Sequence, residues 1–205
     1  MTQPSNPNTK SIKSERRMIT CPISEGLTLL RGLSPKRLRF ELEYSLERGS
    51  TANSFLFDAS FDANGNLQPA VLIHPPGAAF QDIFIPALAK VLPEGTSELI
   101  VVIGHINPNR VLLIKSLAQI YPQIKLIASN PGTKLIKEIW VQKKPGNTQV
   151  IDSEPNIPEI KSIKQEEKLI LGSGDQLLLI PAPTARWPGG LIAFNLNQGL
   201  LMSGK

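Results

Sequence analysis

The chain has one cysteine, Cys21, among its 205 residues, so it cannot form an internal disulfide. A single thiol fits a reducing compartment, and we expect a cytoplasmic location. No apolar run approaches the roughly 20 residues needed to span a bilayer, so membrane insertion is not expected. The polar N-terminal segment also lacks the apolar centre of a secretory signal.

Aromatic residues and strong charge of one sign are scarce as well. Aromatics make up 5% of the chain, and the net charge of +5 is moderate and spread along the sequence. A nucleic-acid surface needs a basic patch with aromatic side chains for base stacking, so no nucleic-acid partner is expected. The hydrophobic content of 41% is enough for one domain with a sizeable core.

The first half of the chain is predicted to be a tail followed by strands. Residues 1–22 are rich in Ser, Asn, Pro, Thr and Lys and are expected to be a disordered tail, which leaves 23–205 as one domain. Strict alternation predicts a half-buried antiparallel strand at 39–46. Strands are also expected at 53–57 and 70–74, with the hairpin signal Asn64-Gly65 between them. His74, at the end of the second of these strands, is interpreted as structural.

From residue 81 on, helical spacing alternates with short apolar runs. Helices are predicted at 81–91, 109–120 and 133–140, strands at 98–103, 125–128, 177–180, 191–194 and 200–202, and an exposed loop or hairpin at 143–161. Asn109 is a good N-cap for the second helix. Gly172-Ser173-Gly174 is interpreted as a tight turn, because no helix-opening pattern follows it. This order favours an α/β (α+β) sandwich built from two sheets.

Several short motifs follow one another in an order typical of one family. They are Asn53-Ser54-Phe55-Leu56, IVVIGHINPNR at 100–110, Ser129-Asn130-Pro131-Gly132, GSGDQL at 172–177 and PAPTARWPGG at 181–190. From about residue 24 to 205, the chain resembles the metallo-β-lactamase-like domain of the diflavin flavoproteins, the flavodiiron oxygen reductases of cyanobacteria and chloroplasts. The resemblance implies an αββα sandwich. We expect it to be C-terminally incomplete, with the flavodoxin-like and flavin-reductase domains absent.

The resemblance also implies a chemistry. Family members hold a non-haem di-iron centre on His, Glu and Asp ligands. They reduce oxygen to water with NAD(P)H-derived electrons that pass through FMN, in dimers where the flavin of one chain approaches the iron of the other. The family's ligand positions fall on His105, Asn107, Asn109, Arg110, Arg186 and Lys205 of this sequence. Of these, His105 alone keeps a ligand type of the family.

The replacements at these positions argue against a bound metal. Asparagine brings no charge to offset a divalent ion, and arginine has no lone pair to donate. Like charges at about 4 Å repel by about 4 kcal/mol even at an effective dielectric near 20. We therefore expect a cationic former metal pocket, with neither iron nor FMN in this chain.

Three functions stay open at this point. The first is a metal-free part of a flavodiiron-type oxidoreductase, inactive alone and paired with a homologous flavodiiron subunit in a hetero- or homo-dimer. The second is a non-enzymatic interaction module whose cationic pocket binds an anion. The third, a metallohydrolase, fits least, because hydrolysis needs a metal-bound water. Trp187 is expected to pack beside the former pocket.

Overall fold

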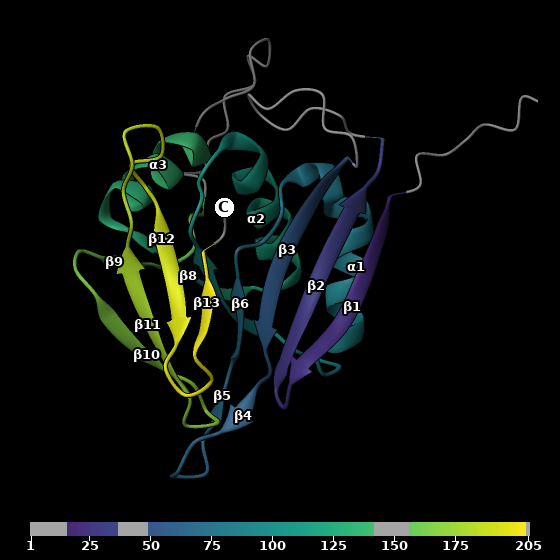
Figure 1. Ribbon diagram of the computed structural model, residues 1–205, viewed down its shortest axis with the longest axis vertical. Coiled ribbons are helices and arrows are strands. Elements are labelled where there is room, and N and C mark those ends of the chain that lie inside the picture. The colour runs from purple at the N-terminus through teal and green to yellow at the C-terminus, as the bar shows by residue number, and fades with distance from the viewer. Residues whose placement is uncertain (1–15, 37–48, 142–155, 204–205) are drawn as a thin grey trace, which may run out of the picture.

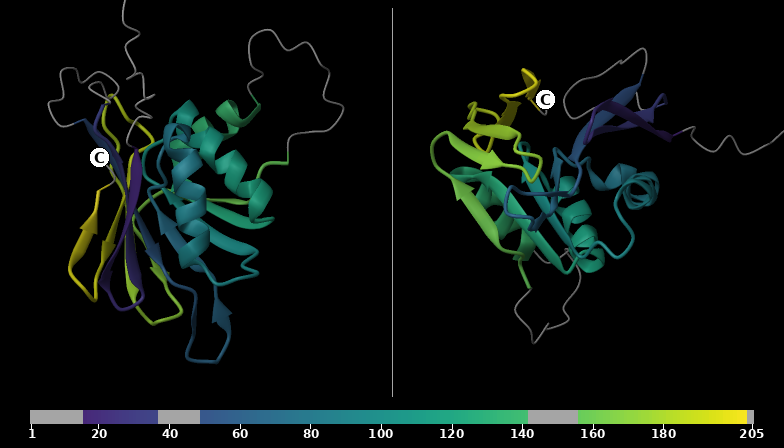
Figure 2. Two further views of the ribbon diagram at one scale, coloured as in Figure 1. Left: turned by 90° about the vertical axis from the view of Figure 1, so that its right-hand side faces the viewer. Right: turned by 90° about the horizontal axis from the view of Figure 1, so that it is seen from below.

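Two β-sheets lie face to face, and three α-helices cover the outer face of the larger sheet (Figures 1 and 2). The computed structural model describes residues 16–36, 49–141 and 156–203. The helices are α1 (Gln81–Val91), α2 (Pro108–Ile120) and α3 (Asn130–Val141), and the 3-10 helix η1 (Ala78–Phe80) precedes α1. The predicted α/β sandwich is confirmed in this helix–sheet–sheet layering.

The larger sheet has seven strands and the smaller sheet four. In spatial order the larger sheet holds β1 (Arg17–Ser24), β2 (Leu27–Ser34), β3 (Ser50–Phe57), β6 (Ala70–Ile73), β7 (Glu98–Ile103), β8 (Gln123–Ser129) and β9 (Ile160–Ile163). The smaller sheet holds β10 (Glu167–Ile170), β11 (Gln176–Pro181), β12 (Leu191–Asn195) and β13 (Leu200–Met202). Strands β6 to β9 are parallel, whereas every other pairing is antiparallel.

Each face of the larger sheet buries its own hydrophobic core. Because side chains alternate along a strand, Leu72 of β6 faces the helices while Val71 and Ile73 face the smaller sheet. All four residues of β6 are buried, as expected for a strand covered on both faces. No helix in the described ranges is long and apolar enough to cross a membrane.

Most of the elements predicted between residues 53 and 202 are confirmed. The helix at 81–91 and the strand at 98–103 have the predicted bounds, and α1 continues through Pro86. The strand at 200–202 also has its predicted bounds, and the remaining predicted elements in the described ranges differ by a few residues at their ends. The Gly172-Ser173-Gly174 segment is a tight turn, in which Gly174 N donates to Leu171 O.

The predicted disordered tail is wrong where it overlaps β1. Residues 17–22 belong to this strand, which pairs with β2 from Arg17↔Leu33 to Ser24↔Leu27. Seven of the eight residues of this edge strand are exposed, so it shows no apolar alternation, and the polar composition of the residues before it was a poor guide. Composition also failed to predict β2, β9 and β10. The strand predicted at 39–46 and most of the loop predicted at 143–161 lie outside the described residues, but β9 occupies the end of that loop.

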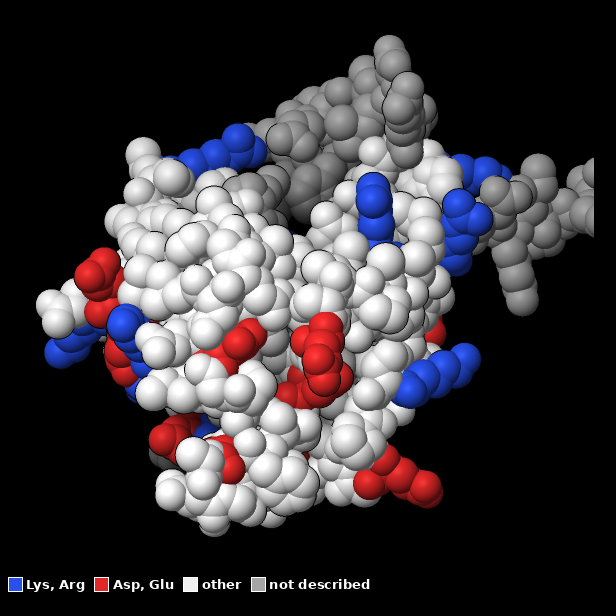
Figure 3. All heavy atoms as spheres, turned by 60° about the horizontal axis from the view of Figure 1, so that its bottom comes forward, with Lys and Arg blue, Asp and Glu red and all other residues white. Residues whose placement is uncertain are grey.

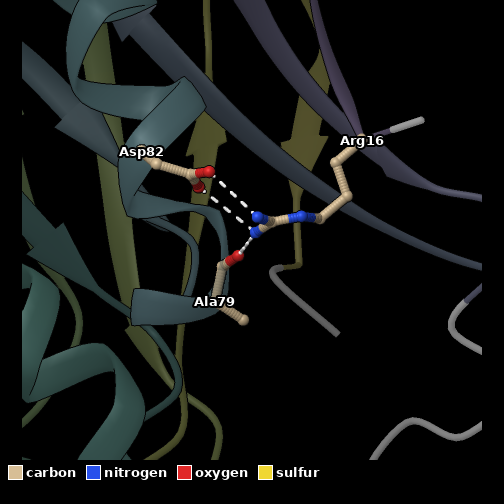
Figure 4. A network of polar contacts seen from close by, with 3 residues as sticks. All are labelled: Arg16, Ala79 and Asp82. Atoms are coloured by element: carbon tan, nitrogen blue, oxygen red, sulfur yellow. Dashed lines mark hydrogen bonds and ion pairs between the residues drawn. The ribbon is translucent and has the colours of Figure 1, made fainter. Parts of the chain in front are cut away.

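The start of β1 is tied to the first turn of α1. Arg16 donates to both carboxylate oxygens of Asp82, with the shorter contact at 2.9 Å, and to the carbonyl oxygen of Ala79 (Figure 4). Both side chains are partly exposed, so this ion pair adds little stability by itself.

A short hairpin projects from the end of the larger sheet. Between β3 and β6, which pair antiparallel, lie β4 (Ser60–Phe61) and β5 (Leu67–Gln68) (Figure 1). The predicted Asn64-Gly65 turn joins these two strands, and Gly65 has a φ of 79° there. Asp62 fixes the turn, because its Oδ1 accepts hydrogen bonds from the backbone nitrogens of Asn64 and Asn66 at 2.9 Å.

Candidate functional site

The candidate site lies where the parallel strands β6, β7 and β8 end. The carboxyl ends of parallel strands meet at one sheet edge, which is where ligands bind in many α/β proteins. Here the edge carries His74 after β6, the loop from Gly104 to Asn107 after β7, and Ser129 at the end of β8. The helices α2 and α3 begin at the same edge.

Asn107 and Arg110 are occupied by local structure. Asn107 is the N-cap of α2, and its Oδ1 accepts a hydrogen bond from Arg110 N at 2.9 Å. Pro108 takes the first helical position, where a missing N–H costs nothing. The N-cap predicted at Asn109 is therefore wrong by two residues, and Asn109 is an exposed residue of the first turn. The Nε of Arg110 donates to the carbonyl oxygen of Pro75 at 3.1 Å.

Replacing Asn107 with alanine is expected to lower the free energy of unfolding by about 1 kcal/mol, the usual cost of a lost N-cap. Denaturant unfolding followed by circular dichroism measures this loss. Asn107→Asp is the matched control, because aspartate keeps the capping oxygen. An alanine variant as stable as the wild type would show that the cap contributes nothing.

A buried His105 and a partly buried Trp187 form the centre of the site. The His105 side chain is 5% exposed and meets the Trp187 ring edge-on, with ring centroids 4.0 Å apart. Arg186 is exposed, and its guanidinium carbon lies 5.5 Å from the centroid of the Trp187 ring. Trp187 thus packs as predicted and joins the predicted site residues His105 and Arg186. Lys205, the sixth predicted position, lies outside the described residues.

The loop that carries Trp187 is joined to the ends of β7 and β8 by two hydrogen bonds. Leu191 N donates to Gly104 O at 3.2 Å, and Ser129 Oγ donates to Gly189 O at 2.9 Å. Ser129 Oγ also accepts from Gly132 N in the first turn of α3, at 3.2 Å. In the sequence, the small residues of Ser129-Asn130-Pro131-Gly132 and Gly189-Gly190 indicate that these two segments can pack closely against each other.

His74 links three strands at the same edge. Its backbone N donates to Val102 O, its carbonyl oxygen accepts from Ser54 Oγ, and its Nε2 donates to Met202 O, each at 2.9 Å. The backbone φ of 56° lies in the left-handed region, which is uncommon for a residue other than glycine. Burial lowers the pKa of His74 to about 4, so the ring is neutral at pH 7. Its Nδ1 has no hydrogen-bond partner among the described residues.

The side chains at this edge do not fit a di-iron centre. The five predicted ligand positions that fall in the described ranges hold one imidazole, two amides and two guanidinium groups. The amide oxygen of Asn107 already accepts a hydrogen bond, and a guanidinium has no free lone pair. The described residues contain no group of three or more His, Cys, Asp or Glu side chains able to hold a metal.

Known sequences place the chain among the diflavin flavoproteins. It is 35% identical over 185 residues to diflavin flavoprotein A 3 of Synechocystis sp., and 36% identical over 184 residues to diflavin flavoprotein A 6 of Nostoc sp.. Each match covers 90% of this chain but 28% of the relative, so the chain spans a little over a quarter of the relatives' length. No protein-family model matches the chain.

Solved structures agree with the sequence matches. A fragment (1–254) of diflavin flavoprotein A 5 from Nostoc sp. has a TM-score of 0.74 at 30% identity, covering 92% of this chain and 66% of that one. A metal-soaked flavodiiron core of Flv1 from Synechocystis sp. has a TM-score of 0.71 at 33% identity, covering 88% of this chain and 40% of that one. The rubredoxin oxygen:oxidoreductase of Desulfovibrio gigas, at 16% identity and a TM-score of 0.68, shares the fold. The chain therefore belongs to the diflavin flavoprotein A (flavodiiron) family, as a metallo-β-lactamase-like domain.

Proposed function

We propose that this chain is the metallo-β-lactamase-like part of a flavodiiron-type oxidoreductase that reduces oxygen to water with NAD(P)H-derived electrons. In this proposal the chain holds no iron or FMN and is inactive alone. It works as a metal-free subunit beside a homologous flavodiiron subunit that keeps its metal ligands. Its role there is to complete the fold and the assembly around the partner's reacting centre.

One observation carries the metal-free part of the proposal: the side chains at the ligand positions serve other purposes. Asn107 caps α2, and Arg110 is held against the Pro75 carbonyl. Both arginines would place a positive charge where the family binds metal cations. Even without either positive charge, His105 would be the only one of the predicted ligand positions in the described residues to carry a residue type that the family uses as a ligand.

The decisive experiment measures metal per chain. The 205-residue chain is expressed with iron and zinc supplied, purified without chelator, and analysed by mass spectrometry. We expect far less than one metal per chain. One or two metals per chain, lost on His105→Ala, would overturn the proposal. The chain would then be a candidate metalloenzyme.

A second variant shows whether the ligand positions are correctly assigned. The triple change Asn107→Glu, Asn109→Asp and Arg110→His restores the ligand types that the family carries. Metal content is expected to rise above that of the wild type, because carboxylates and imidazole replace amides and a guanidinium. No rise in a folded triple variant would mean that these three side chains do not line a metal pocket.

Anion binding at the same edge is the second candidate. It is favoured by the exposed guanidinium of Arg186, which lies over the Trp187 ring. Quenching or enhancement of tryptophan fluorescence by inorganic phosphate, abolished by Arg186→Gln, would support it over a purely structural subunit.

A further inference from the structure

Several turns at the end of the molecule opposite the candidate site carry acidic side chains and no basic ones. Five turns converge there: 25–26 between β1 and β2, 58–59 between β3 and β4, 62–66 between β4 and β5, 171–175 between β10 and β11, and 196–199 between β12 and β13. They contain Glu25, Asp58, Asp62 and Asp175 but no lysine or arginine. Figure 3 shows carboxylates in the middle of this face and basic side chains toward its margin. We call this surface the acidic pole.

The turns of the acidic pole are physically joined. A Cβ added to Gly172 would come within 2.2 Å of Ser60 O, so the β10–β11 turn lies directly against the β4–β5 hairpin. On the other side, Ser24 Oγ donates to Gln198 Oε1 at 2.9 Å, which joins the β1–β2 and β12–β13 turns. The acidic pole is therefore one continuous surface formed by both sheets.

Two carboxylates of the acidic pole, Asp62 and Asp175, accept hydrogen bonds from neutral donors. Asp175 accepts hydrogen bonds from Asn195 Nδ2 and Gln198 Nε2, at 3.0 and 3.1 Å. Asp62 accepts from two backbone nitrogens and from Gln68 Nε2, and its backbone hydrogen bond from Asn66 is the main cause of a lowered pKa. These donors are neutral amides, so they do not cancel the negative charge of either carboxylate, and that charge is left for a partner to neutralise.

The acidic pole also exposes large hydrophobic side chains to solvent. Ile170, Phe61 and Leu67 are 68%, 67% and 62% exposed, the three highest values for large hydrophobic side chains in the described ranges. Phe61 and Leu67 are opposite each other in the β4–β5 register, so they share one face of the projecting hairpin. Hydrogen bonds to Asp62 hold their turn in one conformation, which reduces the entropy lost when a partner covers them.

We propose that the acidic pole is a docking surface for a basic, amphipathic segment of another protein. Apolar side chains of that segment pack on Phe61 and Leu67, and its lysines or arginines lie against Glu25, Asp58 and Asp175. Apolar anchors surrounded by charges of one sign are typical of interfaces in which burial gives affinity and charge selects the partner. An anionic lipid surface is disfavoured by the same carboxylates, and a second copy would have to set two acidic poles together in a symmetric dimer.

Fluorescence polarisation with defined peptides tests the proposal. The probe is a short fluorescein-labelled peptide of alternating lysine and leucine, compared with its counterpart that has glutamate in place of lysine. The full 205-residue chain is expected to bind the lysine peptide, more weakly as salt is added, and not the glutamate peptide. The double change Phe61→Ser with Leu67→Ser is expected to weaken binding about tenfold. The double change Glu25→Gln with Asp58→Asn should also weaken binding and reduce its salt dependence.

Matched variants and a second measurement make the test decisive. Ile19→Ser with Leu112→Ser removes two other exposed apolar side chains, near the start of β1 and in the first half of α2, which lie toward the candidate site and away from the acidic pole, and should leave binding unchanged. No binding by the wild type, or equal losses in both serine pairs, overturns the proposal. So does sedimentation showing a dimer that Phe61→Ser with Leu67→Ser dissociates, because the occupant would then be a second copy.

Discussion

Replacing Gly104 with alanine is expected to unfold the domain. A Cβ at this position would lie 2.1 Å from Leu191 O and 2.2 Å from Cε1 of His74. Neither neighbour can move cheaply, because Leu191 N donates to Gly104 O and the His74 ring is buried and bonded to Met202 O. We expect a loss of about 4 kcal/mol or more, a large part of the ~5–15 kcal/mol that stabilises an ordinary domain.

Urea unfolding measures this loss, and Gly95→Ala is the matched control. Gly95 has a φ of 77° but nothing within 4 Å of the added Cβ, so its replacement should cost only the backbone strain, about 1–2 kcal/mol. Equal losses at the two positions would mean that the two sheets separate easily at Gly104 and that the close approach there is not essential.

The stability of the domain is expected to fall as the pH drops from 6.5 to about 4. In the unfolded chain His74 has the ordinary pKa of 6.5, whereas burial lowers the pKa in the folded state to about 4. Between these values the unfolded chain binds a proton that the folded chain does not, so acid favours unfolding. The contribution of His74 is complete above pH 6.5 and is lost progressively down to pH 4. Its size is about 3 kcal/mol, from 1.36 kcal/mol per pKa unit.

Urea unfolding at a series of pH values through this window measures the effect. His74→Asn is the informative variant, because asparagine tolerates the left-handed backbone and does not titrate. It should be less stable than the wild type at pH 7.5 but should lose most of the pH dependence between 4.5 and 6.5. The chain's other histidine, His105, serves as the control through His105→Gln. A pH dependence that follows His105 instead would contradict the assignment.

The side-chain types at the predicted ligand positions follow from the sequence alone, because residue type is a local property. The predicted ligand positions after His105 carry Asn107, Asn109 and Arg110. An uncharged amide or a guanidinium is a poor replacement for a carboxylate or an imidazole on iron. What those side chains do instead could not be anticipated. The N-cap was predicted two residues too late, since both Asn107 and Asn109 suit a helix start and only the backbone geometry distinguishes them.

The sequence by itself determined the elements with strong periodicity. Apolar runs identified β7, and helical spacing identified α1 and α2, because these patterns record which face of each element is buried. The tertiary structure alone decided the pairings between distant segments. The edge strand β1 needs β2 beside it, the left-handed His74 needs Met202 as an acceptor, and His105 meets Trp187 only when the sheets are stacked. The acidic pole is the clearest case: four of its five turns carry one carboxylate each, and the turns come from segments spread between residues 25 and 199. They converge because antiparallel strands return the chain repeatedly to the same end of the sheets.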